Sequence, residues 1–407
     1  MTKEGAALST VPDSQEIWVR CDTLFTPFQR RRDWMLHILG GRIRAMLPEA
    51  ECRSVHPGGV LHIPGALVAP GFFDLHVHGA AGHDFMEGSE DALRAAAAHL
   101  ASHGTTSFLA TTMTAPADRL EAAVRGLAAA RHAAVEGAAM AGIHLEGPYL
   151  NPERRGVHDA RFLTRTDTGR FLRLVELSEQ SIRRITIAPE MDPGFELIRE
   201  ASARGIQVSL GHSDATAEQA RAAVDAGATQ ATHTLNAMRP WHQREPGVAG
   251  IALTDDRVYA EVIADGIHVH PIAMQLLVRA KGGERTLLAT DSSSAAGMPD
   301  GRYPLGDRIF EVKDGVCRDE EGRLAGSTLT LDCAVRNLIG WLDLPLHEAL
   351  AAASAAPARS MRMGDRKGII SLGADADLVF LSPELSVLMT MVAGRVVYRQ
   401  PAGGKAT

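Results

Sequence analysis

The stretch Gly71-Phe72-Phe73-Asp74-Leu75-His76-Val77-His78-Gly79 is an apolar run that ends in two histidines. Residues two apart in a β-strand point to the same face, so both imidazoles can reach one point in space. The preceding Pro70-Gly71 favours a turn, and the run itself indicates a buried strand. Two histidines at the C-terminal end of such a strand predict a metal site, although an incidental pair of strand histidines would give the same pattern.

Further strand-like runs alternate with helical segments through the middle of the chain. Ser89 is suited to cap a helix from Glu90, and Gly205 and Gly227 are typical helix ends. Such alternation predicts a parallel sheet, and eight repeats predict a closed (β/α)8 barrel. The eight expected strands lie near Leu75 and at residues 106–111, 141–145, 185–188, 206–210, 229–233, 258–264 and 286–290.

Short strand-like segments occupy both ends of the chain. The segment from Leu36 to Arg44, with Gly40-Gly41 at its centre, is typical of a β-hairpin. Similar segments recur from Asp377 to Tyr398. We therefore expect a small β domain built from residues 1–66 and 362–407, and a barrel domain from residues 67–361.

Composition favours a cytoplasmic enzyme. The 407 residues are 45% hydrophobic and 22% charged, and the net charge of −7 gives no support to nucleic-acid binding. Four scattered cysteines, without a C-x-x-C pair, fit a reducing compartment. Residues 1–19 lack the pattern of a signal peptide, and no apolar run approaches the ~20 residues of a membrane span.

Histidine and acidic residues recur where the expected strands end, and these ends meet at one rim of a barrel. Glu146, His212 and His233 would hold a metal that keeps an open position for water and lowers the pKa of that water. His76 and His78 could hold a second ion. The strand ends concerned are His76-Val77-His78, His144-Leu145-Glu146, Gly211-His212, Thr232-His233 and Thr290-Asp291.

Asp291 is the best candidate for the general base, which would take a proton from water and return it to the leaving group. Each residue also has a simpler interpretation: His212 or His233 alone could be a structural histidine, and Asp291 could cap a helix. Imidazole and carboxylate ligands suit zinc, iron, cobalt and manganese, and zinc is our first expectation, with one or two ions per subunit.

These motifs resemble the amidohydrolase superfamily and, within it, the N-acetylglucosamine-6-phosphate deacetylase family. The His-x-His pair marks only the superfamily, whereas His-Leu-Glu-Gly-Pro, Asn-Ala-Met and Arg-Glu-Pro-Gly are much more specific to the deacetylases. The resemblance extends from about Asp22 to Tyr398. Its motifs occupy residues 70–79, 144–151, 156–158, 211–216, 232–238, 244–250, 264–269, 290–292, 325–330 and 373–379.

The resemblance implies hydrolysis of the acetamide of N-acetylglucosamine 6-phosphate to glucosamine 6-phosphate and acetate, in amino-sugar catabolism. It also implies a distorted (β/α)8 TIM-like barrel with a small β-sandwich made from both termini, and a homodimer. The matching positions place the main metal on Glu146, His212 and His233, and the acid/base on Asp291. The implied substrate contacts are His158 near the acetamide, Asn236, the backbone of Ala237 and His268 at the phosphate, and Arg244 across the dimer interface.

Some residues near the expected sugar site depart from the family pattern. Thr234-Leu235 stands where an aromatic residue is frequent, and Ser292-Ser293-Ser294 replaces a segment that is usually richer in alanine. The preference for glucosamine or galactosamine substrates is therefore open.

Three other readings compete with the deacetylase. A D-aminoacylase would leave Arg244, His268 and Asn236 without a role. A cyclic-amide hydrolase commonly has a carboxylated lysine as a metal bridge, and no lysine ends an expected barrel strand here. A barrel that had lost its chemistry should show gaps in its ligand set, and this chain shows none.

Overall fold

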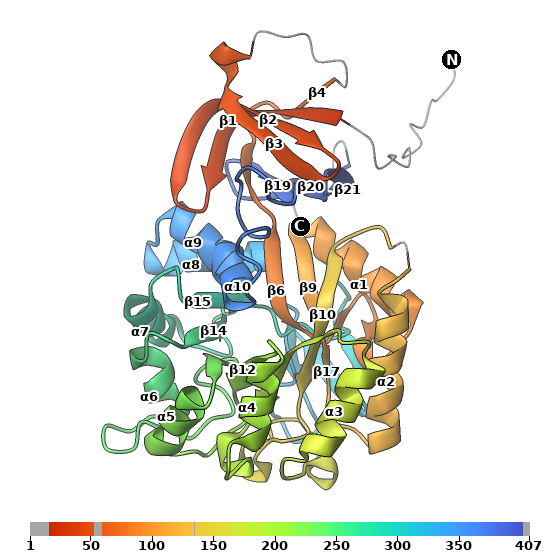
Figure 1. The fold of residues 1–407 in the computed structure, drawn as a ribbon, viewed down its shortest axis with the longest axis vertical. Helices are drawn as coiled ribbons and strands as arrows, with labels where there is room; N and C mark the ends of the chain where they lie inside the picture. Colours follow the sequence, from red (N-terminus) through yellow and green to blue (C-terminus); the bar gives the residue numbers. More distant parts are fainter. Residues whose placement is uncertain (1–15, 53–58, 134, 402–407) are drawn as a thin grey trace.

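The computed structural model describes residues 16–52, 59–133 and 135–401. It contains a parallel barrel of eight strands, surrounded by helices and joined to a sheet made from both ends of the chain (Figure 1). Residues 1–15, most of the segment that is expected to lack a signal peptide, lie outside the described residues. Within them, no helix is long and apolar enough to cross a membrane.

The predicted (β/α)8 barrel is confirmed. Its strands pair side by side in the order of the chain, with β6 and β15 at the two ends of the hydrogen-bonded path. A parallel bridge between Val77 and Ser292 brings these ends together. The strands are β6 (Phe72–Val77), β9 (Thr105–Thr112), β10 (Ala139–Glu146), β11 (Ile182–Ile187), β12 (Gln207–Leu210), β13 (Ala228–Ala231), β14 (Tyr259–Ile263) and β15 (Thr286–Ala289).

Helices follow most barrel strands and cover them from outside (Figure 1). As predicted, Ser89 caps α1, because its side chain accepts the backbone N–H of Ala92. The helices are α1 (Glu90–Ser102), α2 (Ala117–Ala130), α3 (Thr168–Leu177), α4 (Glu196–Ala203), α5 (Ala217–Asp225), α6 (Gly247–Thr254), α7 (Pro271–Lys281), α8 (Leu331–Leu342), α9 (Leu346–Ala353) and α10 (Ala355–Ser360).

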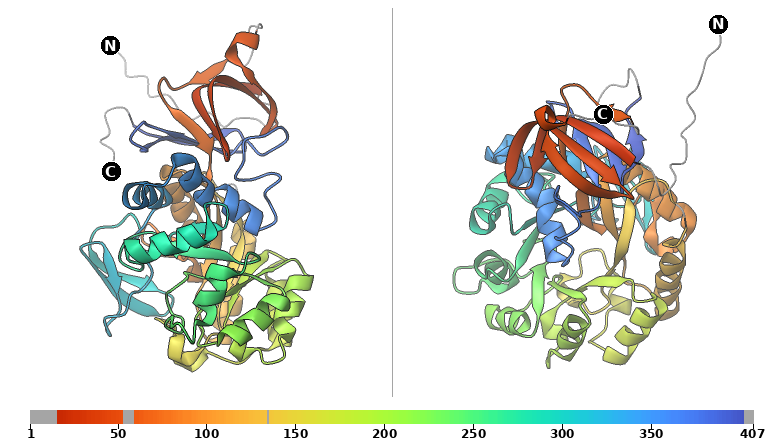
Figure 2. Two further views of the ribbon diagram at one scale, coloured as in Figure 1. Left: turned by 90° about the vertical axis from the view of Figure 1, so that its left-hand side faces the viewer. Right: turned by 45° about the horizontal axis from the view of Figure 1, so that its top comes forward.

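The two ends of the chain meet in one sheet, and its two halves face each other as layers (Figure 2). Val19, Leu36 and Ile43 share a core with Phe380 and Met389, so the sheet folds over as a small sandwich. The strands are β1 (Glu16–Thr26), β2 (Gln29–Leu39), β3 (Arg42–Pro48), β4 (Val60–His62), β5 (Leu67–Pro70), β19 (Leu378–Leu381), β20 (Val387–Val392) and β21 (Arg395–Arg399).

The strand β5 pairs with β1 and with β19, so Leu67–Pro70 belongs to the terminal sheet rather than to the barrel. The chain passes directly from β5 into β6 through Gly71. No side chain fits there, because a Cβ on Gly71 would lie 2.1 Å from the side chain of Thr106. The sequence predicts that the terminal domain ends at residue 66, whereas β5 of the terminal sheet ends at Pro70, four residues later. The other domain limits remain a prediction.

A small antiparallel sheet after β15 was not predicted. It consists of β16 (Gly301–Leu305), β17 (Arg308–Lys313) and β18 (Val316–Arg318), and the turn after β18 leads to the mouth of the barrel. A further short pair, β7 (Gly79–Ala80) and β8 (His83–Asp84), follows β6. In Figure 1, β6 runs away from the terminal sheet, so its histidines lie at the opposite end of the barrel.

Candidate metal centre and active site

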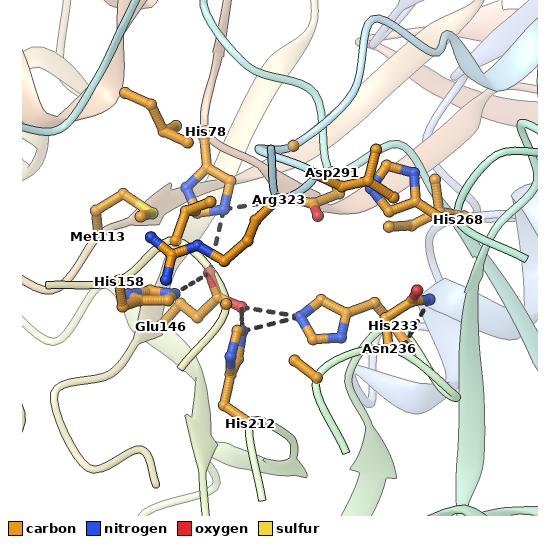
Figure 3. A pocket seen from close by; sticks show the side chains of 17 residues that line it. His78, Met113, Glu146, His158, His212, His233, Asn236, His268, Asp291 and Arg323 are labelled. Atoms are coloured by element: carbon orange, nitrogen blue, oxygen red, sulfur yellow. Dashed lines mark hydrogen bonds and ion pairs between the residues drawn. The ribbon is translucent and has the colours of Figure 1, made fainter. Parts of the chain in front are cut away.

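A pocket opens at the C-terminal ends of the barrel strands (Figure 3). Most of the side chains that we singled out from the sequence contribute to it. The predicted residues that line the pocket are His78, Glu146, His158, His212, His233, Asn236, Ala237, His268 and Asp291.

The first possible metal group consists of His76, His78 and Glu146, all buried. The two imidazoles turn their Nε2 atoms toward each other at 3.2 Å. Nε2 of His76 lies 3.4 Å from Oε1 of Glu146, and Nε2 of His78 lies 3.1 Å from Oε2. His76 lies in β6 and His78 directly follows that strand, and their spacing of two residues is the one that places side chains on the same face.

The second group consists of Glu146, His212 and His233. The two Nε2 atoms face each other at 3.0 Å, and they lie 3.3 and 3.5 Å from Oε1 of Glu146. His212 shares a hydrogen bond of 2.9 Å between Nδ1 and the carbonyl oxygen of Arg154. A carbonyl only accepts, so Nδ1 carries the proton and Nε2 keeps its lone pair for a metal.

The chemistry of these donors fits a divalent cation. Two pairs of imidazole nitrogens face each other in a buried space, and Oε1 of Glu146 has no hydrogen-bond partner there. Buried polar atoms in this state need a partner, and imidazole with carboxylate is a usual ligand set for zinc and similar metals. Burial alone would raise the pKa of Glu146, but the surrounding histidines, His76 foremost, lower it well below its usual range.

Asp291 follows β15, and its Oδ1 lies 3.4 Å from Nε2 of His76 and 3.3 Å from Nε2 of His78. Although burial raises the pKa of this carboxyl group, the two histidines lower it to far below the usual range. Asp291 is therefore held as a carboxylate beside the two histidines of the first possible metal group.

Several of these residues have strained backbones. His212, His233, Ala237 and Asp291 all have positive φ angles, between 27° and 51°. Residues other than glycine seldom adopt such angles, and strain of this kind gathers at functional sites.

His158 is buried at the pocket wall with its ring orientation fixed. Nδ1 accepts the backbone N–H of Thr114 at 3.3 Å and also lies 2.9 Å from the Thr114 hydroxyl. The ring proton must therefore be on Nε2, which lies 3.4 Å from Oε2 of Glu146. Burial lowers the pKa of His158 to about 4, so the ring is a neutral N–H donor at pH 7.

The residues expected to bind phosphate divide into two groups. Asn236, Ala237 and His268 line the pocket, and Nδ1 of His268 contacts Oδ2 of Asp265 at 2.6 Å. Arg244 lies in an exposed loop of the single chain and does not line the pocket. Its expected role across a dimer interface remains a prediction.

Sequence reasoning missed Arg323, which follows the unpredicted β16–β18 sheet. Its guanidinium binds Oδ2 of Asp319 at 2.8 and 2.7 Å, and Figure 3 shows it across the pocket mouth. Among the described pocket-lining residues it is the one arginine or lysine. It stands in the charged turn Asp319-Glu320-Glu321-Gly322-Arg323, where nothing local distinguishes it from a solvated residue.

Comparison with known proteins supports the same family. The amidohydrolase family model matches residues 67–397. This chain belongs to the amidohydrolase family. It is 40% identical over 329 residues to the N-acetylglucosamine-6-phosphate deacetylase of Vibrio furnissii, a match that covers 81% of this chain and 82% of the relative.

This amidohydrolase is also similar to a second curated relative and to a solved structure. It is 38% identical to the N-acetylgalactosamine-6-phosphate deacetylase of Escherichia coli O157:H7, over 89% of this chain and 94% of that one. A mutant N-acetyl-D-glucosamine-6-phosphate deacetylase from Mycobacterium smegmatis, solved with N-acetyl-D-glucosamine-6-phosphate, superposes with a TM-score of 0.87 at 35% identity. That match covers 94% of this chain and 100% of the other. The resemblance to N-acetylglucosamine-6-phosphate deacetylases is thus confirmed.

Proposed function

We propose that this protein hydrolyses the acetamide of N-acetylglucosamine 6-phosphate to glucosamine 6-phosphate and acetate, in amino-sugar catabolism. The observation that carries the proposal is the convergence of Asp291, His158 and the shared ligand Glu146 on one pocket. That arrangement supplies a carboxylate base and a neutral N–H donor beside a set of metal ligands. Metal-dependent amide hydrolysis uses groups of these three kinds.

Glu146, His212 and His233 would hold the main divalent ion, for which zinc is our first choice, with iron, cobalt and manganese as alternatives. His76 and His78, with Glu146, would hold a second. When bound, such an ion polarises the carbonyl group and lowers the pKa of a water molecule in its open position. The remaining steps belong to residues of the chain.

Asp291 accepts the proton of the attacking water while the oxygen of that water bonds to the acetyl carbon. The proton then passes from Asp291 to the sugar nitrogen, because an amide nitrogen leaves poorly without one. The C–N bond breaks to give acetic acid and the free amine, and the acid then gives its proton to the amine, so acetate and the protonated amine leave. Nε2–H of His158 donates to the acetyl oxygen, on which negative charge develops in the transition state.

Phosphate recognition would place the acetamide at this centre. Asn236, the backbone of Ala237 and His268 would hold the phosphate within the subunit, and Arg244 would reach it from the partner in a homodimer. Charge-assisted hydrogen bonds to phosphate are worth about 1.5–3 kcal/mol each. We propose that the protein works in the cytoplasm.

The test is acetate release from N-acetylglucosamine 6-phosphate, with unphosphorylated N-acetylglucosamine as the matched control and metal content measured on the same sample. We expect fast turnover of the phosphorylated sugar only. Absence of turnover on both sugars, with metal bound, would reject the sugar-phosphate substrate and direct the search to N-acyl-D-amino acids.

N-acetylgalactosamine 6-phosphate is a second candidate substrate. Relatives named for the two epimers are almost equally similar to this chain, at 40% and 38% identity. The same assay run with both phosphorylated epimers gives the ratio of their kcat/KM values, which decides between them.

A further inference from the structure

Two opposite charges are completely buried in the barrel below the metal centre. Arg184 lies in β11 and Glu261 in β14, and neither side chain is exposed to solvent. Nη1 of Arg184 lies 2.5 Å from Oε2 of Glu261, as a close ion pair without the alignment of a hydrogen bond. Burying two charges costs several kcal/mol per ion, so a hydrophobic pair would serve stability at least as well. The pair therefore calls for a further role.

The other oxygen of Glu261 reaches both possible metal groups. Oε1 lies 2.8 Å from Nδ1 of His76 and accepts the backbone N–H of His233 at 3.0 Å. His76 belongs to the first group and His233 to the second. One carboxylate oxygen thus holds one member of each group.

The contact with Glu261 determines which nitrogen of His76 is free. Nδ1 faces a carboxylate, which only accepts hydrogen bonds, so Nδ1 carries the ring proton. Nε2 therefore turns its lone pair toward the other residues of the first metal group. The neighbouring His144 lacks this arrangement, because its two ring nitrogens contact the hydroxyl groups of Thr111 and Thr186. Its ring lies 4.7 Å from that of His76, yet it belongs to neither metal group.

Arg184 is fixed by more than its ion pair. Its Nη1 donates to the carbonyl oxygen of Leu75 at 3.2 Å, and its Nη2 donates to Oγ of Ser209 at 3.0 Å. Leu75 directly precedes His76 in β6. The guanidinium therefore holds the Glu261 carboxylate and the strand that carries His76 in one rigid arrangement.

We propose that Glu261 is a positioning residue for the metal centre, which orients His76 and His233 as ligands, and that Arg184 is its built-in counter-charge. This inference deepens the proposed metal-dependent function and rests on it. A carboxylate that receives the second N–H of a metal-binding histidine makes that histidine a better ligand, and loss of such a partner typically costs about 10–100-fold in metal affinity or activity.

The experiment must separate positioning from stability. Glu261→Gln alone would leave the Arg184 charge buried without its partner and would destabilise the fold. The double variant Arg184→Met/Glu261→Gln removes both charges at similar volume, so it should restore stability. Gln230→Leu is the matched control, because Gln230 is also fully buried in the barrel but hydrogen-bonds the carbonyl oxygen of Ser360, away from the metal ligands.

Each full-length protein is freed of metal and divided into two samples. The melting temperature is measured on one sample. The other, still folded, is titrated with zinc alone against a competing chromophoric chelator. We expect the metal-free double variant to melt above the Glu261→Gln variant, while at least one zinc equivalent binds about 10–100-fold more weakly than in the wild type. The Gln230→Leu control should bind zinc as the wild type does. Zinc affinities within threefold of wild type at every equivalent in the double variant would overturn the proposal.

A second variant keeps the test decisive if the double variant does not fold. Glu261→Asp keeps a negative charge for Arg184 but withdraws the carboxylate by about 1.5 Å, the length of one carbon–carbon bond. The same weakening of zinc binding is expected, and unchanged binding again overturns the inference. No sugar is present in these titrations, so failure of the deacetylase assignment would appear separately, as metal-loaded wild type without turnover.

Discussion

Thr114 donates its backbone N–H to Nδ1 of His158 over 3.3 Å, and this single contact determines where the imidazole carries its proton. Nε2–H then faces the pocket beside Glu146. Because burial holds the pKa of His158 at about 4, the ring donates a hydrogen bond at neutral pH without carrying a charge.

His158→Phe should lower kcat by about 10²–10³-fold, since it removes one donor from the developing oxyanion. His158→Gln should retain part of the activity, because its amide can still donate. Steady-state kinetics with metal analysis checks the prediction. A His158→Phe enzyme with nearly full kcat and normal metal content would show that this N–H does not stabilise the transition state.

Asp291→Asn should lower kcat by about 10²–10⁴-fold, because an amide cannot accept the proton of water. Its shape is preserved, so bound metal should remain. Single-turnover acetate release and metal analysis on one preparation measure both quantities. Glu311→Gln, on the exposed face of β17, is the control for loss of a carboxylate elsewhere. Substantial turnover by the Asn variant would remove Asp291 from the proton transfer.

Arg323→Met should raise KM for the phosphorylated sugar by at least about threefold at low salt, because it removes a cation from the pocket mouth. Arg302→Met is the control, since Arg302 lies in β16 of the small sheet that precedes Arg323 but is 66% exposed and pairs with Glu320. Added salt should shrink the difference. An equal rise in KM for the unphosphorylated sugar would argue that Arg323 acts through packing and not through charge.

Arg244→Ala should weaken binding of the phosphorylated sugar, by about tenfold or more, if the loop reaches phosphate in a dimer. The residue is exposed in the single chain, so its loss should leave the melting temperature unchanged. Kinetics on both sugars, with sedimentation to establish the oligomeric state, tests this. Equal effects on phosphorylated and unphosphorylated sugar would contradict the expected contact.

His99→Leu should make the protein less sensitive to mild acid. Burial, aided by His103, lowers the pKa of His99 to about 4 in the folded state, from about 6.5 when unfolded. The unfolded chain therefore binds the proton first, and stability falls as pH drops from about 6.5 to 4. From this group alone the free energy of unfolding should fall by about 2 kcal/mol between pH 7 and pH 5.

Urea unfolding at the two pH values measures that difference in wild type and variant. His132→Leu is the control, because His132 is 61% exposed and pairs with Glu179 at the surface. If wild type and His99→Leu lose the same stability between pH 7 and pH 5, another group is responsible.

The barrel and its ligand histidines could be predicted because their signals are local. Each buried strand is a short apolar run, and the ligands stand at its end or just after it, so the geometry of parallel strands places them together. Glu261 could not be assigned in the same way. It lies inside the apolar run 258–264, and its partners His76 and Arg184 are distant in sequence. A charge within an otherwise apolar strand is the one signal that could have drawn notice.

The β16–β18 sheet and Arg323 were missed for a different reason. The sheet is an exposed antiparallel insertion with mixed composition, and alternation along β17 is short. Only the course of the chain after β18 brings Arg323 over the pocket, and no local pattern encodes that course.

The pairing of β5 with β19 has a consequence for synthesis of the chain on the ribosome. Leu67 pairs with Leu381, so the ribosome makes the partner strand β19 about 300 residues after β5. At about 5–20 residues per second, the delay is roughly 15–60 s. During that time the apolar face of β1–β3, with Val19, Leu36 and Ile38, has no C-terminal layer to cover it. The nascent chain therefore exposes this apolar face until the strand that contains Leu381 has been made.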